Sequence, residues 1–127
     1  MSNPNPVVHF EVLGPDGPGL IDFYRQLFGW QLHEGRLTGW PHYGLLRDHG
    51  EGRIGGAIGT ADAAKGPTVV IYIEVDNPHA YLERAEALGA TVMMPVTHVA
   101  EAEVTVAWLR DPQGNVVGVV KNDETDT

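Results

Sequence analysis

The chain has no cysteine and few basic residues, and both absences narrow its chemistry. Because none of its 127 residues is cysteine, disulfides, thiolate metal sites and a cysteine nucleophile are excluded. Its 8 lysines and arginines stand against 17 acidic residues, which gives a net charge of −9. Nucleic acids and anionic membranes are bound through basic surfaces, so we expect neither as a partner.

Long hydrophobic runs are also missing. No apolar stretch approaches the ~20 residues that a membrane-spanning helix needs. Residues 1–6 have neither the basic region nor the apolar stretch of a secretory signal, so we expect a cytoplasmic protein. The length suits one domain with its own core and is too short for two independent ones, which predicts a single domain over residues 1–127.

What the chain does contain is a repeat. Alternating residues over 7–13 predict a strand with two different faces. An apolar stripe then follows at helical spacing, formed by Leu20, Phe23, Tyr24 and Leu27. Residues 68–75 and 78–88 repeat this order of strand and helix. Three shorter strands are expected after each helix, near 30–34, 42–47 and 53–60 in the first half and near 91–94, 103–110 and 115–121 in the second.

The helix ends carry recognisable signals. Gly29 and Gly89 stand where a helix C-terminus favours a left-handed residue. Asn77 suits the N-cap of the second helix, and Pro78 suits its first turn.

Each half therefore reads β-α-β-β-β, which predicts an α+β fold of two βαβββ modules. Module one covers about residues 7–60, a linker covers 61–67, and module two covers about 68–121. Two such modules side by side can curl their mixed sheets into a shared concave pocket, with the helices outside. We therefore expect a small-molecule ligand to bind between the two modules.

Four segments follow one another along the chain: the first strand with His9, residues 23–30, residues 73–76 and residues 111–115. In this order they resemble the vicinal-oxygen-chelate superfamily of glyoxalases, bleomycin-resistance proteins and extradiol dioxygenases. The resemblance implies paired βαβββ modules, a homodimer and a site inside the curled sheets. In the metal-dependent members a divalent ion is held by ligands on the first and last strands of each module and acts as a Lewis acid.

The resemblance places these four ligand positions on His9, Gly56, Val70 and Gly118, and alignment of the chain's own repeats places Tyr72 opposite His9. Glycine and valine side chains cannot ligate a metal, so only His9 is a competent ligand. We therefore expect no cofactor. The alternative is a divalent metal on a ligand set shifted around His9, drawn from Glu11, Glu74, His42, His49, His98, Glu101 and Glu103.

Strand alternation places Glu11 on the same face as His9, and Glu74 on the same face as Val70 and Tyr72. His9 and Glu11 are therefore candidate catalytic residues. For His9, a pocket-lining hydrogen-bonding or acid–base role stands beside a structural hydrogen bond and metal ligation.

The candidate ligand-binding residues are Tyr72, Glu74, Trp108 and Val70. Core packing is the alternative for the two aromatic residues. Exposure at a sheet face or at the mouth of a barrel is the alternative for Glu74.

These observations predict a glyoxalase- or bleomycin-resistance-like small-molecule-binding protein with a degenerate metal site. The alternative is a divalent-metal-dependent lyase, isomerase or dioxygenase that uses a shifted ligand set around His9. A third possibility is an interaction module that has no ligand. The sequence leaves open whether the protein is an enzyme.

Overall fold

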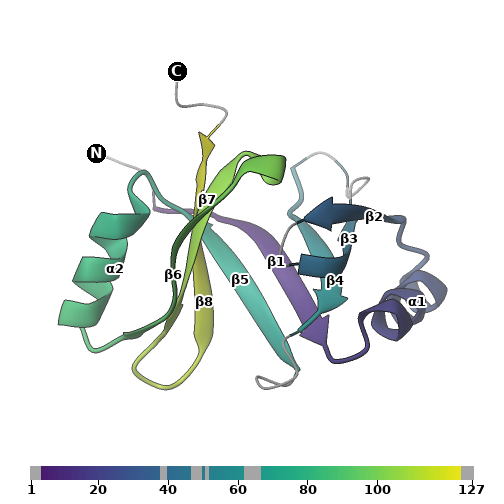
Figure 1. Ribbon diagram of the computed structural model, residues 1–127, viewed down its shortest axis with the longest axis horizontal. Coiled ribbons are helices and arrows are strands. Elements are labelled where there is room, and N and C mark those ends of the chain that lie inside the picture. The colour runs from purple at the N-terminus through teal and green to yellow at the C-terminus, as the bar shows by residue number, and fades with distance from the viewer. Residues whose placement is uncertain (1–3, 38–39, 47–49, 51, 62–66, 124–127) are drawn as a thin grey trace. The chain divides into compact units, whose positions relative to one another are not determined.

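The computed structural model describes residues 4–37, 40–46, 50, 52–61 and 67–123 (Figure 1). The chain divides into two compact units. The N-terminal unit is His9–Val70, and the C-terminal unit is Ile71–Thr127 together with Met1–Val8. None of the helices in the described part of the chain is long and apolar enough to cross a membrane.

The N-terminal unit contains a four-stranded mixed sheet with a helix against it. In chain order its elements are β1 (Val7–Gly14, which enters the unit at His9), α1 (Gly17–Phe28), β2 (Leu32–Leu37), β3 (Trp40–Leu46) and β4 (Gly55–Thr60). The strand order is β2-β3-β4-β1. The β1 and β4 strands run parallel, and the other neighbours are antiparallel.

The C-terminal unit repeats this arrangement. Its elements are β5 (Thr68–Glu74, which enters the unit at Ile71), α2 (Pro78–Ala87), β6 (Thr91–Val99), a short 3₁₀ turn η1 (Ala100–Ala102), β7 (Val104–Arg110) and β8 (Val116–Asn122). The order is β6-β7-β8-β5, with β5 and β8 parallel and the other neighbours antiparallel. The predicted α+β class and the two βαβββ modules are confirmed. The module boundaries and the shared pocket stay predictions, and residues 62–66 of the expected linker lie outside the described residues.

The predicted roles of Gly29, Asn77 and Pro78 at the helix ends are confirmed, whereas α2 ends at Ala87 with Leu88 as its C-cap, just before Gly89. The Asp16 side chain caps α1 by accepting the Gly19 N–H, and Gly29 ends it in a left-handed conformation with φ of 68°. The Asn77 side chain caps α2 by accepting the Ala80 N–H at 3.3 Å, with Pro78 in the first turn.

The face that α1 buries keeps Leu20 and Tyr24 of the predicted stripe and replaces Phe23 and Leu27 by Ile21. Ile21 is 1% exposed, whereas Phe23 and Leu27 are 53% and 59% exposed. The contact between Gly17 and the end of β4 explains the rotation, because a Cβ at position 17 would lie 2.1 Å from Thr60 Oγ1. Gly17 and Ile21 share one side of the helix, so seating the first turn on β4 turns Ile21 inward.

Each unit has its own core of side chains from its helix and its sheet. Figure 1 shows α1 and α2 each beside the strands of their own unit. The buried core residues are Ile21, Leu32, Leu46 and Ile58 in the N-terminal unit and Val75, Leu82, Ala107 and Val119 in the C-terminal unit. The helices therefore occupy one face of each sheet, and the candidate polar residues of β1 belong to the other face.

We predict that Asn77→Ala lowers the free energy of unfolding by about 1 kcal/mol, because the Ala80 N–H loses its acceptor. Asn77→Asp should preserve stability, since a carboxylate accepts the same bond and suits the positive end of the helix. Urea unfolding followed by circular dichroism measures both. An equal loss in the two variants would contradict the capping role.

Candidate functional site

The site in the N-terminal unit is built on the face of β1 that points away from α1. Phe10 and Val12 pack toward the core under α1, so the alternating residues His9 and Glu11 point to the opposite side. In the parallel register His9 lies beside Gly55 and Glu11 lies beside Ala57. These two neighbours are small, which leaves space over β4 for a side chain from β3.

Tyr43 of β3 fills that space and links the two candidate residues. Its hydroxyl donates a hydrogen bond to Glu11 Oε2 at 2.6 Å. The Tyr43 hydroxyl oxygen also lies 2.8 Å from His9 Nε2. The rings of His9 and Tyr43 stack with 6.5 Å between their centroids. The shared hydroxyl confirms that His9 and Glu11 lie on one face, as strand alternation predicts.

The direction of these hydrogen bonds determines the tautomer of His9. A phenol has one hydrogen, and Tyr43 gives it to the Glu11 carboxylate, so His9 Nε2 must donate to the Tyr43 oxygen. Burial lowers the pKa of the His9 imidazole from 6.5 to about 4. At neutral pH His9 is therefore an uncharged imidazole with its hydrogen on Nε2.

Glu11 is the buried polar residue of this site. It is 3% exposed, whereas His9 and Tyr43 are half-buried. A carboxylate so far from water requires hydrogen-bond donors, and Tyr43 supplies one of them. Glu11 is thus the most deeply buried of the three side chains.

The ligand positions implied by the family do not fit a divalent metal. Gly56 pairs with Phe10 and shares its face, and a Cβ there would lie 2.2 Å from the Phe10 ring. A Cβ at Gly118 would lie 2.5 Å from the Tyr72 ring. At both positions an aromatic ring therefore occupies the space that a ligating side chain would need.

The shifted ligand set is also not assembled. Within the described ranges, no three His, Asp or Glu side chains lie together as a metal site would require. His9 Nε2 and Glu11 Oε2 both contact the Tyr43 hydroxyl. Of the other proposed substitutes, His42 lies 3.8 Å from Glu34, His98 lies 2.8 Å from Asp123, and His49 falls outside the described residues.

The C-terminal unit brings two predicted ligand-binding residues together. Trp108 Nε1 donates to Tyr72 Oη at 2.6 Å, and these residues are 6% and 3% exposed. Both pair with Gly118, on the face opposite the α2 core. The pair therefore forms a buried aromatic surface that only a glycine between the strands permits.

The other two predicted ligand-binding residues do not join this pair. Val70 is fully buried and belongs to the N-terminal unit. Glu74 is exposed, and its backbone N–H and carbonyl bond to the carbonyl of Pro6 and the side chain of Asn5. Glu74 thus lies at the end of β5, where its backbone is hydrogen-bonded to residues 5–6.

Tyr43 is the member of this candidate site that the sequence does not single out. The segment 42–47 was expected as a strand, but nothing in its pattern distinguishes a site tyrosine from a packing one. Tyr43 comes close to His9 and Glu11 only because β3 pairs with β4 and β4 pairs with β1. The sequence pattern of residues 42–47 does not indicate this pairing.

Known structures share this fold at low sequence identity. Methylmalonyl-CoA epimerase from Mycobacterium tuberculosis is 18% identical with a TM-score of 0.67, over 95% of this chain and 92% of that chain. A single-residue variant of methylmalonyl-CoA epimerase from Streptomyces coelicolor is 14% identical with a TM-score of 0.66, over 93% and 97%. The hypothetical protein BH1468 from Bacillus halodurans C-125 is 18% identical with a TM-score of 0.65, over 94% and 95%.

No curated protein matches the sequence. The family comparison does give a match, to the Glyoxalase/Bleomycin resistance protein/Dioxygenase superfamily, and it extends over residues 7–119. That range includes both modules and the His9, Tyr43 and Glu11 side chains. The chain therefore belongs to the Glyoxalase/Bleomycin resistance protein/Dioxygenase superfamily.

Proposed function

We propose that this protein binds a small organic molecule at His9 and Tyr43, without the divalent metal that many members of its superfamily use. The observation that carries the proposal is the hydrogen-bonded chain from His9 through Tyr43 to the buried Glu11. Polar side chains held in one orientation among apolar neighbours are typical of ligand sites.

His9, Tyr43 and Glu11 each have a distinct role in this proposal. Glu11 accepts the Tyr43 hydrogen and so fixes the direction of the hydroxyl. His9 is neutral, and a group with a pKa near 4 is a weak base at neutral pH. His9 therefore suits hydrogen bonding to a ligand better than proton abstraction, and Glu11 is the better candidate for a base.

An acyl thioester is the ligand class that we propose. The Streptomyces coelicolor epimerase variant was solved in complex with 2-nitronate-propionyl-CoA, and a methylmalonyl-CoA epimerase was solved with methylmalonyl-CoA and NH₄⁺. The net charge of −9 disfavours the phosphates of CoA. We therefore expect the acyl-pantetheine part, which lacks those phosphates, to carry the recognition.

The first test is calorimetric titration with propionyl-CoA, methylmalonyl-CoA and S-propionyl-pantetheine. We expect the pantetheine thioester to bind at least as tightly as propionyl-CoA. His9→Gln and Tyr43→Phe should each weaken binding by about 5- to 10-fold, the value of a well-placed hydrogen bond. His79→Gln, an exposed histidine at the start of α2, is the matched control and should bind like the wild type. Binding that is unchanged in all three variants would contradict the proposal.

The alternative function, a metal-dependent lyase, isomerase or dioxygenase, gives a different result. Elemental analysis of protein purified without chelators should show no stoichiometric Fe, Mn, Ni or Zn. A metal bound one to one in the wild type and lost in His9→Ala would overturn the metal-independent site. Catalysis by Glu11 stays a prediction. It is tested by solvent deuterium exchange at the carbon next to the thioester carbonyl, in wild type and Glu11→Gln.

The homodimer that the family resemblance implies also stays a prediction. Light scattering after size-exclusion chromatography measures the mass directly, against 13.8 kDa for one chain.

We predict that Tyr43→Phe lowers the free energy of unfolding by about 1–3 kcal/mol, because it removes a donor from a buried carboxylate. Tyr81→Phe is the matched control. Its hydroxyl makes an exposed 3.3 Å bond to Asn5, so we expect a loss of about 0.5 kcal/mol or less. Urea unfolding at pH 7.5 compares the two. Equal losses would show that Glu11 does not depend on Tyr43.

We predict that His9 makes the protein less stable in acid. Its pKa is about 4 in the folded chain and 6.5 as the ordinary value, so the unfolded chain binds more protons between these limits. Above pH 6.5 this difference in pKa has almost no effect on stability. As the pH falls it lowers the free energy of unfolding, by about 2 kcal/mol at pH 5. Wild type should therefore lose about that much more stability than His9→Gln between pH 7.5 and pH 5. Parallel pH profiles would contradict the buried neutral imidazole.

A further inference from the structure

A concave surface lies in the N-terminal unit, and none of His9, Glu11 and Tyr43 lines it. This groove has a volume of about 670 Å³. One wall is α1, the floor is the end of β1 at residues 12–15, and the opposite wall is residues 67–69. The volume lies within the range of small-molecule sites, and most of the lining side chains are apolar.

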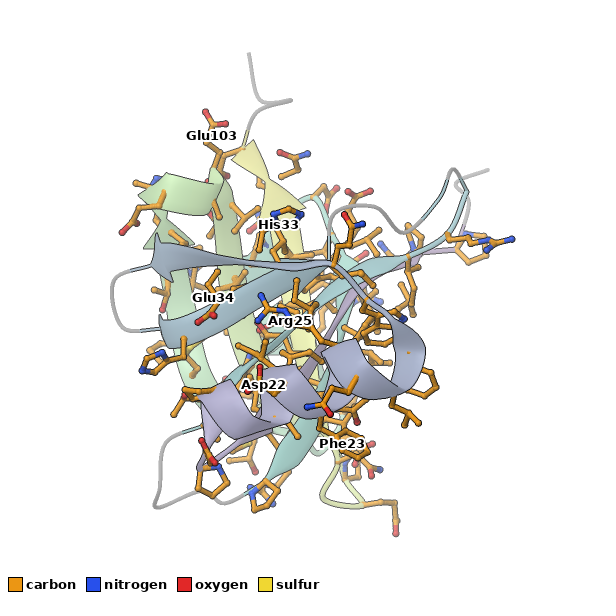
Figure 2. The ribbon with its side chains drawn as sticks, turned by 90° about the vertical axis from the view of Figure 1, so that its right-hand side faces the viewer. Asp22, Phe23, Arg25, His33, Glu34 and Glu103 are labelled. Atoms are coloured by element: carbon orange, nitrogen blue, oxygen red, sulfur yellow. The ribbon has the colours of Figure 1, made fainter. Side chains whose placement is uncertain are left out.

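The wall from α1 is a single helical stripe. Asp16, Gly19, Leu20 and Phe23 follow one another at i, i+3, i+4 and i+7. At 1.5 Å per residue, Asp16 and Phe23 are about 10 Å apart along the helix. Phe23 is 53% exposed, and Figure 2 shows it on the helix with Asp22 and Arg25. Val69 on the opposite wall is 64% exposed, so both rims carry exposed apolar side chains.

The ionisable group in the lining of the groove is acidic. Asp16 is the sole ionisable side chain among its lining residues in the described part of the chain. Its Oδ1 accepts the Gly19 N–H at 3.1 Å, which fixes the carboxylate at the start of the helix. A Cβ at position 19 would lie 2.4 Å from Asp16 Oδ2, so the carboxylate can occupy this position only because residue 19 is glycine.

We propose that this groove binds an amphipathic cation of the alkylammonium class. The ammonium group pairs with Asp16, and the apolar chain lies along Leu20 toward Phe23. The roughly 10 Å between the two ends sets the length of the chain. The net charge of −9 also favours the approach of a cation over that of an anion. This site is separate from the one proposed at His9.

The test is titration of the ¹⁵N-labelled protein with octylammonium, octanol and octanoate below their micelle concentrations, followed by amide chemical shifts. We expect octylammonium to bind most tightly, octanoate least, and butylammonium more weakly than octylammonium. The shifted amides should be those of Gly14, Gly19, Leu20, Phe23 and Val69.

Three variants separate the contributions. Asp16→Asn keeps the helix cap and removes the charge, so octylammonium binding should weaken about 2- to 5-fold while octanol binding is unchanged. Phe23→Ala should weaken both ligands about 5- to 10-fold. Asp22→Asn removes the same charge from α1 outside the groove and is the matched control.

Three results would overturn the proposal. The first is equal binding of octylammonium and octanoate, and the second is amide shifts confined to residues outside the groove. An effect of Asp22→Asn as large as that of Asp16→Asn would also overturn it, because it would show attraction to overall charge alone. Thioester binding at His9 is independent of each of these results.

Discussion

The burial of Glu11 is the constraint on which the N-terminal site depends. A carboxylate that is 3% exposed must be hydrogen-bonded, and Tyr43 can reach it only if β1, β4 and β3 lie side by side in their observed register. The small residues Gly55 and Ala57 beside His9 and Glu11 leave the space that Tyr43 crosses. One buried carboxyl group therefore links strand order, register and side-chain size to a single arrangement of polar atoms.

Side-chain packing explains why the ligand positions that the family resemblance implies do not fit a metal. Gly56 and Gly118 lie under the rings of Phe10 and Tyr72. Gly56 also shares the core face of Phe10, opposite to the face of His9. The two modules have also diverged from each other, since the residues opposite each other in the repeat, His9 and Tyr72, bond to a tyrosine hydroxyl and to a tryptophan N–H.

Much of this could be predicted from the sequence, because it follows from local patterns. Alternation over residues 7–13 places His9 and Glu11 on one face, and Asn77 and Gly29 mark helix ends by their side-chain chemistry. The buried face of α1 could be predicted only in part in the same way. Leu20 and Tyr24 pack on the core as predicted, and the contact of Gly17 with β4 brings Ile21, in place of Phe23 and Leu27, beside them.

The sequence by itself determined the two βαβββ modules, the strand that carries His9 and Glu11, and the lack of side chains able to ligate a metal at Gly56, Val70 and Gly118. These depend on residue type and on spacing along the chain. The tertiary structure alone decided that Tyr43 joins His9 to Glu11, that Trp108 donates to Tyr72, and that Asp16 and Phe23 share a groove with Val69. Each of these involves residues 32 to 53 positions apart, brought together by strand pairing and by the seating of a helix, which no local pattern encodes.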